Sequence, residues 1–250
     1  MIAYDKDRDK NNHTILLYGS PGAGKTYLAS EIAKTKHTLL FDIDLGAKTI
    51  HNLPKEIEEN IVTIQYTAFS DLQQIYQMIS ANNTADEWNK FFEVKKMNIK
   101  IDRPFEAIII DSLSELQRQM ELELSQDSMI NMLKNPKDIK PLRIQDWGAI
   151  LSLTEMIVAD AFGSLPITFI ATAHEQMIEN EATGEVAGTP KLRGKLAFDI
   201  GKHFDFMGRL TFARTGQRVL YTKTEKKWQA KTRWDHDAVI VNPRMEDIIR

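Results

Sequence analysis

The chain has 250 residues, and its 42% hydrophobic and 27% charged residues are ordinary values for a water-soluble globular protein with one core. It contains no cysteine, which excludes disulfide bonds, thiolate catalysis and cysteine-based zinc sites. The net charge is −3, and no apolar segment approaches the roughly 18 residues of a membrane span, so a cytoplasmic protein without a membrane partner is expected.

The first 13 residues are polar and charged, and we expect them to form a flexible segment, whereas residues 14–250 are expected to form a single domain. Residues 14–18 predict a strand and residues 27–34 a helix. Between the two lies the pattern G-x-x-x-x-G-K-[ST], a phosphate-binding loop. Its residues are Gly19, Ser20, Pro21, Gly22, Ala23, Gly24, Lys25 and Thr26.

The spacing of this loop has a chemical reason. Glycines let the backbone curl so that successive N–H groups point at phosphate oxygens, and the following helix directs its positive end at the same anion. Lys25 adds a positive charge for the outer phosphates, and Thr26 offers a hydroxyl group to Mg²⁺. The sequence therefore predicts binding of a nucleoside triphosphate together with Mg²⁺.

The next predicted strand, residues 39–44, ends in two acids, Asp42 and Asp44. Because side chains alternate along a strand, both should lie on the same side, where one of them would face the terminal phosphate. Alternatively, both acids merely solvate or cap the following turn. A short strand at residues 61–64, a helix at 71–79 capped by Ser70 or Asp71, and a helix at 85–97 follow.

Residues 107–111 predict a buried strand that ends in Asp111. In phosphate-loop proteins such an acid reaches Mg²⁺, usually through water, from the strand beside the loop. Many ring-forming ATPases carry a glutamate directly after this acid to orient the attacking water, but here Ser112 occupies that position. A carboxylate from a neighbouring strand is therefore needed for hydrolysis.

Helices are predicted from Ser112 onward and over residues 147–162, followed by a strand at 167–172. This strand leads into polar residues from Thr172 to Glu175, which are candidates for sensing the terminal phosphate. The histidines of the chain show no metal-ligand spacing. Buried strands separated by helices predict an α/β fold with a mainly parallel central sheet flanked by helices.

The pattern changes after residue 205, where residues 206–213 and 218–224 predict an antiparallel hairpin and residues 228–234 a third strand. Asn242 and Pro243 would begin a short C-terminal helix. Residues 125–146 and 175–195 have no regular pattern, and structureless loops of this length are usually functional. Residues 191–233 hold twelve basic and three acidic residues, a local charge of +9, which indicates either a polyanion partner or a solvated sheet face.

In this order, the motifs resemble those of the RecA-like phosphate-loop ATPases, in particular small phage nucleotide-binding proteins of the AAA-24 type that act in single-strand annealing recombination. The residues that carry the resemblance are 19–26, 41–47, 109–112, 146–148, 172–175, 189–195 and 231–233. The resemblance implies a RecA-like fold, ATP rather than GTP as substrate, and a location in the host cytoplasm if the chain is phage-encoded.

The resemblance also implies roles for individual residues. Asp44 would position the attacking water beside Lys25, and His174 and Glu175 would link the nucleotide state to a DNA-binding loop. The two DNA-contacting loops would be residues 125–146 and 175–195. Lys231 and Arg233 would reach the nucleotide of a neighbouring subunit, which implies a homo-oligomeric ring or filament.

The second of these loops departs from the expected pattern, because its first half carries four glutamates. Acids repel phosphates, so the DNA contacts are assigned to its basic second half, at Lys191, Arg193 and Lys195. We therefore expect a Mg²⁺-dependent ATPase that binds single-stranded DNA, with a single-strand-binding or recombination protein as a further partner. Two alternatives remain open: a small-molecule or nucleotide kinase, and a nucleotide-gated adaptor such as a helicase loader.

Overall fold

The computed structural model describes residues 12–124, 142–179, 184 and 186–249. Residues 1–11 of the predicted flexible segment, and 125–141 of the first predicted DNA loop, lie outside the described residues. The strands are β1 Thr14–Gly19, β2 Thr38–Asp42, β3 Ile61–Gln65, β4 Ala107–Asp111, β5 Thr168–Glu179, β6 Val186–Pro190, β7 Phe206–Phe212, β8 Arg218–Tyr221, β9 Lys231–Thr232 and β10 Val239–Val241.

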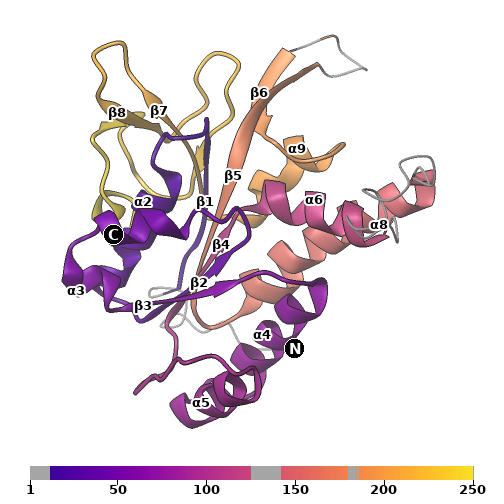
Figure 1. Cartoon of the computed structure of the whole chain (residues 1–250). Coiled ribbons are helices and arrows are strands. Elements are labelled where there is room, and N and C mark those ends of the chain that lie inside the picture. Colours follow the sequence, from indigo (N-terminus) through magenta and orange to yellow (C-terminus); the bar gives the residue numbers. More distant parts are fainter. Residues whose placement is uncertain (1–11, 125–141, 180–183, 185, 250) are drawn as a thin grey trace, which may run out of the picture.

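These strands form one sheet in the order β3-β2-β4-β5-β1-β7-β8-β10, with β6 beside β5 and β9 beside β7 (Figure 1). The six neighbouring strands β3, β2, β4, β5, β1 and β7 pair in parallel. Strands β8, β10, β6 and β9 pair antiparallel to their neighbours. The predicted fold class, a mainly parallel sheet flanked by helices with antiparallel C-terminal strands, is therefore confirmed.

The helices are α2 Lys25–Ser30, α3 Lys55–Glu58, α4 Phe69–Asn82, α5 Ala85–Val94, α6 Leu113–Leu124, α8 Ile144–Met156 and α9 Leu196–Asp199. Helix α2 continues as a 3₁₀ turn, Glu31–Lys34, and α8 as a π-helical turn, Ile157–Ala161. The predicted helix at residues 71–79 is longer than expected, and its N-cap is Ala68, whose backbone N–H donates to Asp71. None of the helices in the described residues is long and apolar enough to span a membrane.

The sheet separates two apolar cores because its central strands are buried on both faces. In β1, Leu16 and Tyr18 face the core that is covered by α4, α5, α6 and α8, whereas Ile15 and Leu17 face the core beneath α2 and α3. This alternation explains the continuous apolar runs in the sequence. The parallel pairing of these strands brings the carboxyl ends of β1, β2, β4 and β5 to one edge of the sheet.

Part of segment 175–195 is regular structure, contrary to the sequence-based expectation, and its residues 180–183 and 185 lie outside the described residues. Residues Glu175–Glu179 continue β5 beyond the sheet, and Val186–Pro190 (β6) pair with them in antiparallel register. We call Glu175–Glu179 and Val186–Pro190 the β5–β6 arm, and Figure 1 shows these two strand segments projecting from the sheet. The sequence did not predict these strands, because the four glutamates of the segment do not alternate regularly with apolar residues.

The C-terminal region also differs from the prediction. Strand β10 was not expected, and it pairs with β8. Asn242 adopts a left-handed conformation instead of capping a helix, and only a short 3₁₀ turn, Met245–Asp247, follows. The predicted hairpin of β7 and β8 is confirmed, and the predicted third strand is shorter, as β9. Buried Met245 and Ile248 pack beside α2 and so add to the second core.

Gly188 provides a stability prediction for the arm. A Cβ atom at this position would lie 2.1 Å from Cε3 of Trp228, whose ring covers the glycine. Gly188→Ala is therefore expected to lower the free energy of unfolding by about 1–3 kcal/mol, as overpacking does. Gly148→Ala is the matched control, because it lies in α8 with open space around it and should stabilise the helix by about 1 kcal/mol. Urea unfolding measures both, and an unchanged or more stable Gly188→Ala protein would contradict the packing of Trp228 on the arm.

Candidate functional site

The predicted phosphate loop joins β1 to α2 at the carboxyl edge of the sheet. Gly22 and Gly24 have φ angles of 78° and 92°, in the left-handed region that favours glycine. The N–H group of Ala23 donates to the carbonyl of Ser20 at 3.2 Å, which closes the turn. The loop thus has the curled backbone that the cradling of a phosphate requires.

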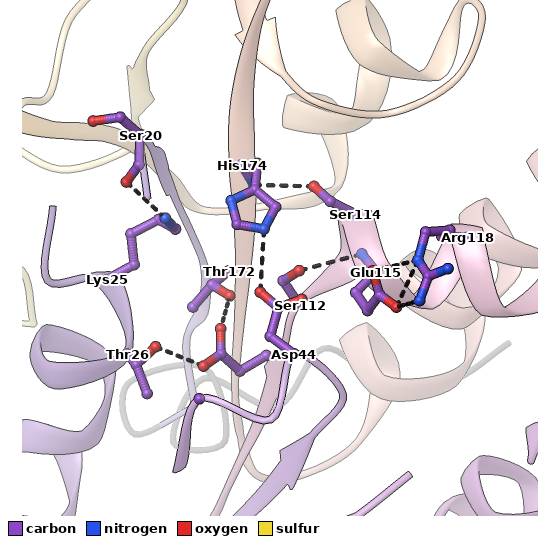
Figure 2. A network of polar contacts seen from close by, with 12 residues as sticks. Ser20, Lys25, Thr26, Asp44, Ser112, Ser114, Glu115, Arg118, Thr172 and His174 are labelled. Carbon is purple, nitrogen blue, oxygen red and sulfur yellow. Dashed lines mark hydrogen bonds and ion pairs between the residues drawn. The ribbon is translucent and has the colours of Figure 1, made fainter. Parts of the chain in front are cut away.

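Lys25 lies inside this loop. Its ammonium donates to the carbonyl oxygens of Gly19 and Ser20, at 3.1 and 3.0 Å (Figure 2). Burial lowers the pKa of Lys25, and the charges of Asp111, Asp44 and Glu175 oppose this shift. The lysine therefore donates its hydrogen bonds to the loop's own carbonyl groups, and carboxylates lie nearby. The motif predicts a phosphate contact at this place.

Thr26 and Asp111 meet as the sequence predicts. The Thr26 hydroxyl donates to Oδ2 of Asp111 at 2.6 Å, and the hydroxyl of Thr172 donates to the other carboxylate oxygen. Asp111 is 2% exposed, and burial, together with the nearby charges of Asp44 and Asp42, raises its pKa against these hydrogen bonds. We expected the strand of Asp111 to lie beside the loop strand, and this was wrong. Strand β5 lies between β4, which carries Asp111, and β1.

The oxygen atoms of Thr26 and Asp111 suit Mg²⁺, which prefers hard oxygen ligands and keeps several waters. No group of three or more His, Cys, Asp or Glu residues that could hold a metal ion occurs in the described part of the chain. A metal held by one hydroxyl, one carboxylate and substrate phosphates fits this donor set. These residues therefore fit the predicted ion.

The carboxylates of Asp42 and Asp44 have different partners. Strand β2 ends at Asp42, so the alternation that we extended to Asp44 stops two residues earlier. The Asp42 carboxylate accepts the N–H groups of Gly46 and Ala47 at 2.9 and 3.1 Å, and it therefore caps the following turn. Only Asp44 is left to face the site.

Asp44 Oδ2 lies 3.3 Å from Nε2 of His174. Burial by itself would raise the pKa of the Asp44 carboxyl, but the hydrogen bond and charge of His174, the hydrogen bond of Ser112 and the charge of Lys25 outweigh it and lower the pKa. Asp44 is consequently a carboxylate at neutral pH. It belongs to the network of polar residues that also includes Lys25, Thr26 and Thr172 (Figure 2).

His174 stands where β5 leaves the sheet. Its backbone N–H donates to Oγ of Ser114 at 3.0 Å, and its carbonyl accepts the N–H of Lys191 at 2.7 Å. Nδ1 is buried without a hydrogen-bond partner among the described residues. The imidazole thus connects the Asp44 carboxylate to the base of the β5–β6 arm.

Glu175 points to a different partner. Its carboxylate pairs with Nε of Arg209 at 2.8 Å, and the Arg209 guanidinium lies 3.6 Å from the centre of the Trp228 ring. A catalytic role for Glu175 would require this pair to open. The pair instead joins β5 to β7, beside the side chain of Tyr18, whose hydroxyl donates to the carbonyl of Gln229.

The two residues predicted to act in trans lie away from the loop, near the amino-terminal end of β7. The Lys231 ammonium donates to the carbonyls of Gly201 and Phe204, each at 2.9 Å, and Arg233 pairs with Asp205 at 2.8 Å. Lys231 is therefore engaged in holding the turn before β7. Because the structure contains one chain, action on a neighbour's nucleotide stays a prediction.

The three residues predicted to contact DNA differ in their surroundings. Arg193 pairs with Glu121 at 2.9 Å and lies over the ring of Trp147, 5.2 Å from its centre. Lys191 and Lys195 are exposed and form no ion pair among the described residues. Several other basic residues of segment 191–233 are also paired, which reduces its free positive charge below the +9 that the sequence suggested. Their acidic partners from outside the segment are Glu155 and Glu175.

Arg218 and Tyr27 were not predicted as site residues. Arg218 begins β8, and its guanidinium lies over the Tyr27 ring, 5.0 Å from the ring centre. A Cβ atom at Gly24 would lie 2.9 Å from Nη1 of Arg218. No local sequence signal places a hairpin residue 192 positions after Thr26 against the loop. Only the parallel pairing of β7 with β1 brings this hairpin there.

Comparison with known proteins gives one family. The model of the AAA-24 family, described as an AAA domain, matches residues 11–234. No curated protein sequence matches the chain. Among solved structures, the chain is similar to the RadB recombinase, with 14% identity, coverage of 91% of this chain and 86% of that chain, and a TM-score of 0.49. It is also similar to the flagellar accessory protein FlaH from Methanocaldococcus jannaschii, with 14% identity, coverage of 98% and 95%, and a TM-score of 0.43.

Proposed function

Because the chain belongs to the AAA-24 family of AAA domains, we propose that it is a Mg²⁺-dependent ATPase that binds single-stranded DNA through the base of its β5–β6 arm. The observation that carries the ATPase proposal is the meeting of Thr26, Asp111 and Asp44 around the phosphate loop. Helix α2 supplies Thr26, strand β4 supplies Asp111, and the turn after β2 supplies Asp44, so the chain brings these groups together from distant positions.

Each residue has a part in the proposed reaction. Thr26 and Asp111 would hold Mg²⁺, which neutralises charge on the phosphate chain when bound. Lys25 would exchange the carbonyls of Gly19 and Ser20 for phosphate oxygens, a contact that restores the hydrogen bonds it gives up. Asp44 would accept a hydrogen bond from the attacking water and hold it in line with the terminal phosphate.

His174 would position Asp44. Its Nε2 already approaches that carboxylate, so that the carboxylate keeps one orientation and its charge. When Asp44 turns to the water, His174 would be free to meet the terminal phosphate. Turnover of ATP, measured as phosphate release with and without single-stranded DNA, tests the proposal. Release that requires an added small-molecule acceptor would instead identify a kinase.

The DNA-binding part of the proposal depends on the surface beside His174. A cavity of about 360 Å³ lies between α6 and the arm, and its lining includes His174, Gln176, Lys191 and Arg193. The acidic residues of this cavity, Glu115 and Glu121, are paired with Arg118 and Arg193. A phosphate backbone at this cavity would therefore meet no unpaired carboxylate. The exposed Lys191 and Lys195 would supply the remaining contacts.

The double change Lys191→Ala/Lys195→Ala is expected to weaken the binding of oligothymidine and to lower the salt dependence. Since each phosphate contact of a single strand contributes about 0.7 to the slope of log K against log salt, the slope should fall by about 1.4. Gel shifts at several salt concentrations measure this. The control Lys90→Ala/Lys100→Ala removes the same charge from exposed positions on and after α5, at the opposite end of the molecule (Figure 1).

Absence of oligothymidine binding by the native protein at low salt, with and without ATP, would refute DNA binding. It would leave the ATPase proposal intact. Where DNA binding holds, the proposed role is phage DNA recombination or annealing as a ring or filament of identical subunits, beside a single-strand-binding or recombination protein. Sedimentation of the protein with and without ATP tests the assembly.

A further inference from the structure

Arg218 reaches the phosphate loop from outside the motif. Its backbone is fixed in β8, opposite Phe212 of β7, and its carbonyl accepts the N–H of Asn242 at 2.7 Å. From this position the side chain crosses to the loop, where Nη1 lies beside Gly24 and the guanidinium lies over Tyr27. The contact with Gly24 is close enough that any larger residue at position 24 would displace the arginine.

Arg218 is a half-buried cation with no carboxylate partner among the described residues. Other arginines of this region do have one: Arg209 pairs with Glu175, Arg233 with Asp205, and Arg244 with Glu31. A guanidinium is always charged and presents a planar set of donors that matches phosphate oxygens. The nearest group built to receive an anion is the phosphate loop itself.

The inner edge of the loop is acidic. Asp111 and Asp44 both act on Lys25, and Glu175 adds to them. A bound triphosphate would bring several further negative charges to a loop whose own motif supplies one cation, Lys25. A second cation at the outer side of the loop, next to Gly24, would balance that charge without crowding Lys25.

We propose that Arg218 binds the phosphate chain of the nucleotide in cis, as a ligand supplied by the C-terminal hairpin. Tyr27 acts as the positioning residue, because its ring lies under the guanidinium and holds it beside the loop before nucleotide arrives. Tyr27 itself lies between two arginines, since Arg244 contacts it from the side of Glu31. This inference rests on the proposed nucleotide binding and adds a residue to it.

Binding of ATP and of inorganic tripolyphosphate to the full chain, measured by calorimetry with Mg²⁺, tests the assignment. Arg218→Ala is expected to weaken both ligands by roughly 10- to 100-fold, the range for charge-assisted hydrogen bonds. Arg218→Lys should recover part of the loss, because it keeps the charge but not the fork. The control is Arg214→Ala, which removes the same charge from an exposed position in the same hairpin and should bind both ligands normally.

Three outcomes overturn the proposal. Normal ATP binding by Arg218→Ala shows that the arginine is not a ligand. Loss of ATP binding with normal tripolyphosphate binding places Arg218 on the base or ribose instead of the phosphates. A structural role is assigned if Arg218→Ala lowers the melting temperature together with the affinity, and Arg218→Lys restores both. By contrast, failure of the native protein to bind either ligand refutes the proposed function itself.

Discussion

Asp44→Asn is expected to reduce ATP hydrolysis by about 10²- to 10⁴-fold, the usual contribution of a positioned base, while ATP binding changes little. The amide keeps the size of the side chain but lacks the negative charge with which Asp44 would hold the attacking water and take up its proton. Because the contacts of His174 and Ser112 lower the pKa of Asp44, loss of the Asp44 charge should limit activity only when the pH falls below the ordinary range of an aspartate. Single-turnover hydrolysis at saturating ATP measures the chemical step.

The control for this change is Asp42→Asn, two residues earlier. Asp42 accepts two backbone N–H groups of the following turn and takes no part in the proposed chemistry. Its replacement should lower stability and leave the rate per folded molecule within a few-fold of native. Hydrolysis at the native rate by Asp44→Asn would refute the assigned base. Full DNA-related function by Asp44→Asn without hydrolysis would identify the nucleotide-gated adaptor.

Lys25→Ala is expected to weaken ATP binding by about 10- to 100-fold or more, and hydrolysis with it. The buried ammonium sits on two loop carbonyls and is the only cation of the motif, so its loss removes the charge that the outer phosphates would meet. Fluorescence of a labelled ATP analogue measures the affinity. Lys34→Ala, an exposed position at the end of the same helical segment, is the control and should bind ATP as the native protein does.

A nucleotide affinity of Lys25→Ala equal to that of the native protein would mean that the loop does not hold phosphate. That result would refute the ATPase proposal as a whole. It would leave DNA binding by the arm to be judged by its own measurement. Lys25→Ala therefore tests whether the site binds ATP, and Asp44→Asn tests whether it hydrolyses the bound ATP.

The parts of this protein that could be predicted from the sequence are those in which local pattern and three-dimensional position coincide. The phosphate loop is contiguous, and the strand that ends in Asp111 is a run of apolar residues with one acid at its end. Because parallel strands align their carboxyl ends, the meeting of Thr26 with Asp111 followed from order alone. The intervening β5 did not, because strand order in the sheet is not the order in the chain.

Other features depended on contacts that no local pattern encodes. Whether Asp42 or Asp44 faced the site was decided by where β2 ends, and Asp42 stops the strand by capping the turn at Gly46. Arg218 reaches the loop through the pairing of β7 with β1, which is a contact between distant parts of the chain. The ion pairs that neutralise much of the basic segment arise from α6, α8 and β5, so charge counting overestimated its free charge.

Strand β5 exchanges its neighbours at one peptide bond. His174 is the last of its residues opposite β1, at Gly19, and Glu175 is the first opposite β6, at Pro190. Strand β5 pairs with both β4 and β1 up to Ala171, with β1 alone from Thr172 to His174, and with β6 from Glu175 onward. The imidazole of His174 therefore lies where β5 passes from β1 to β6, and it also contacts Asp44, the carboxylate proposed to handle the water.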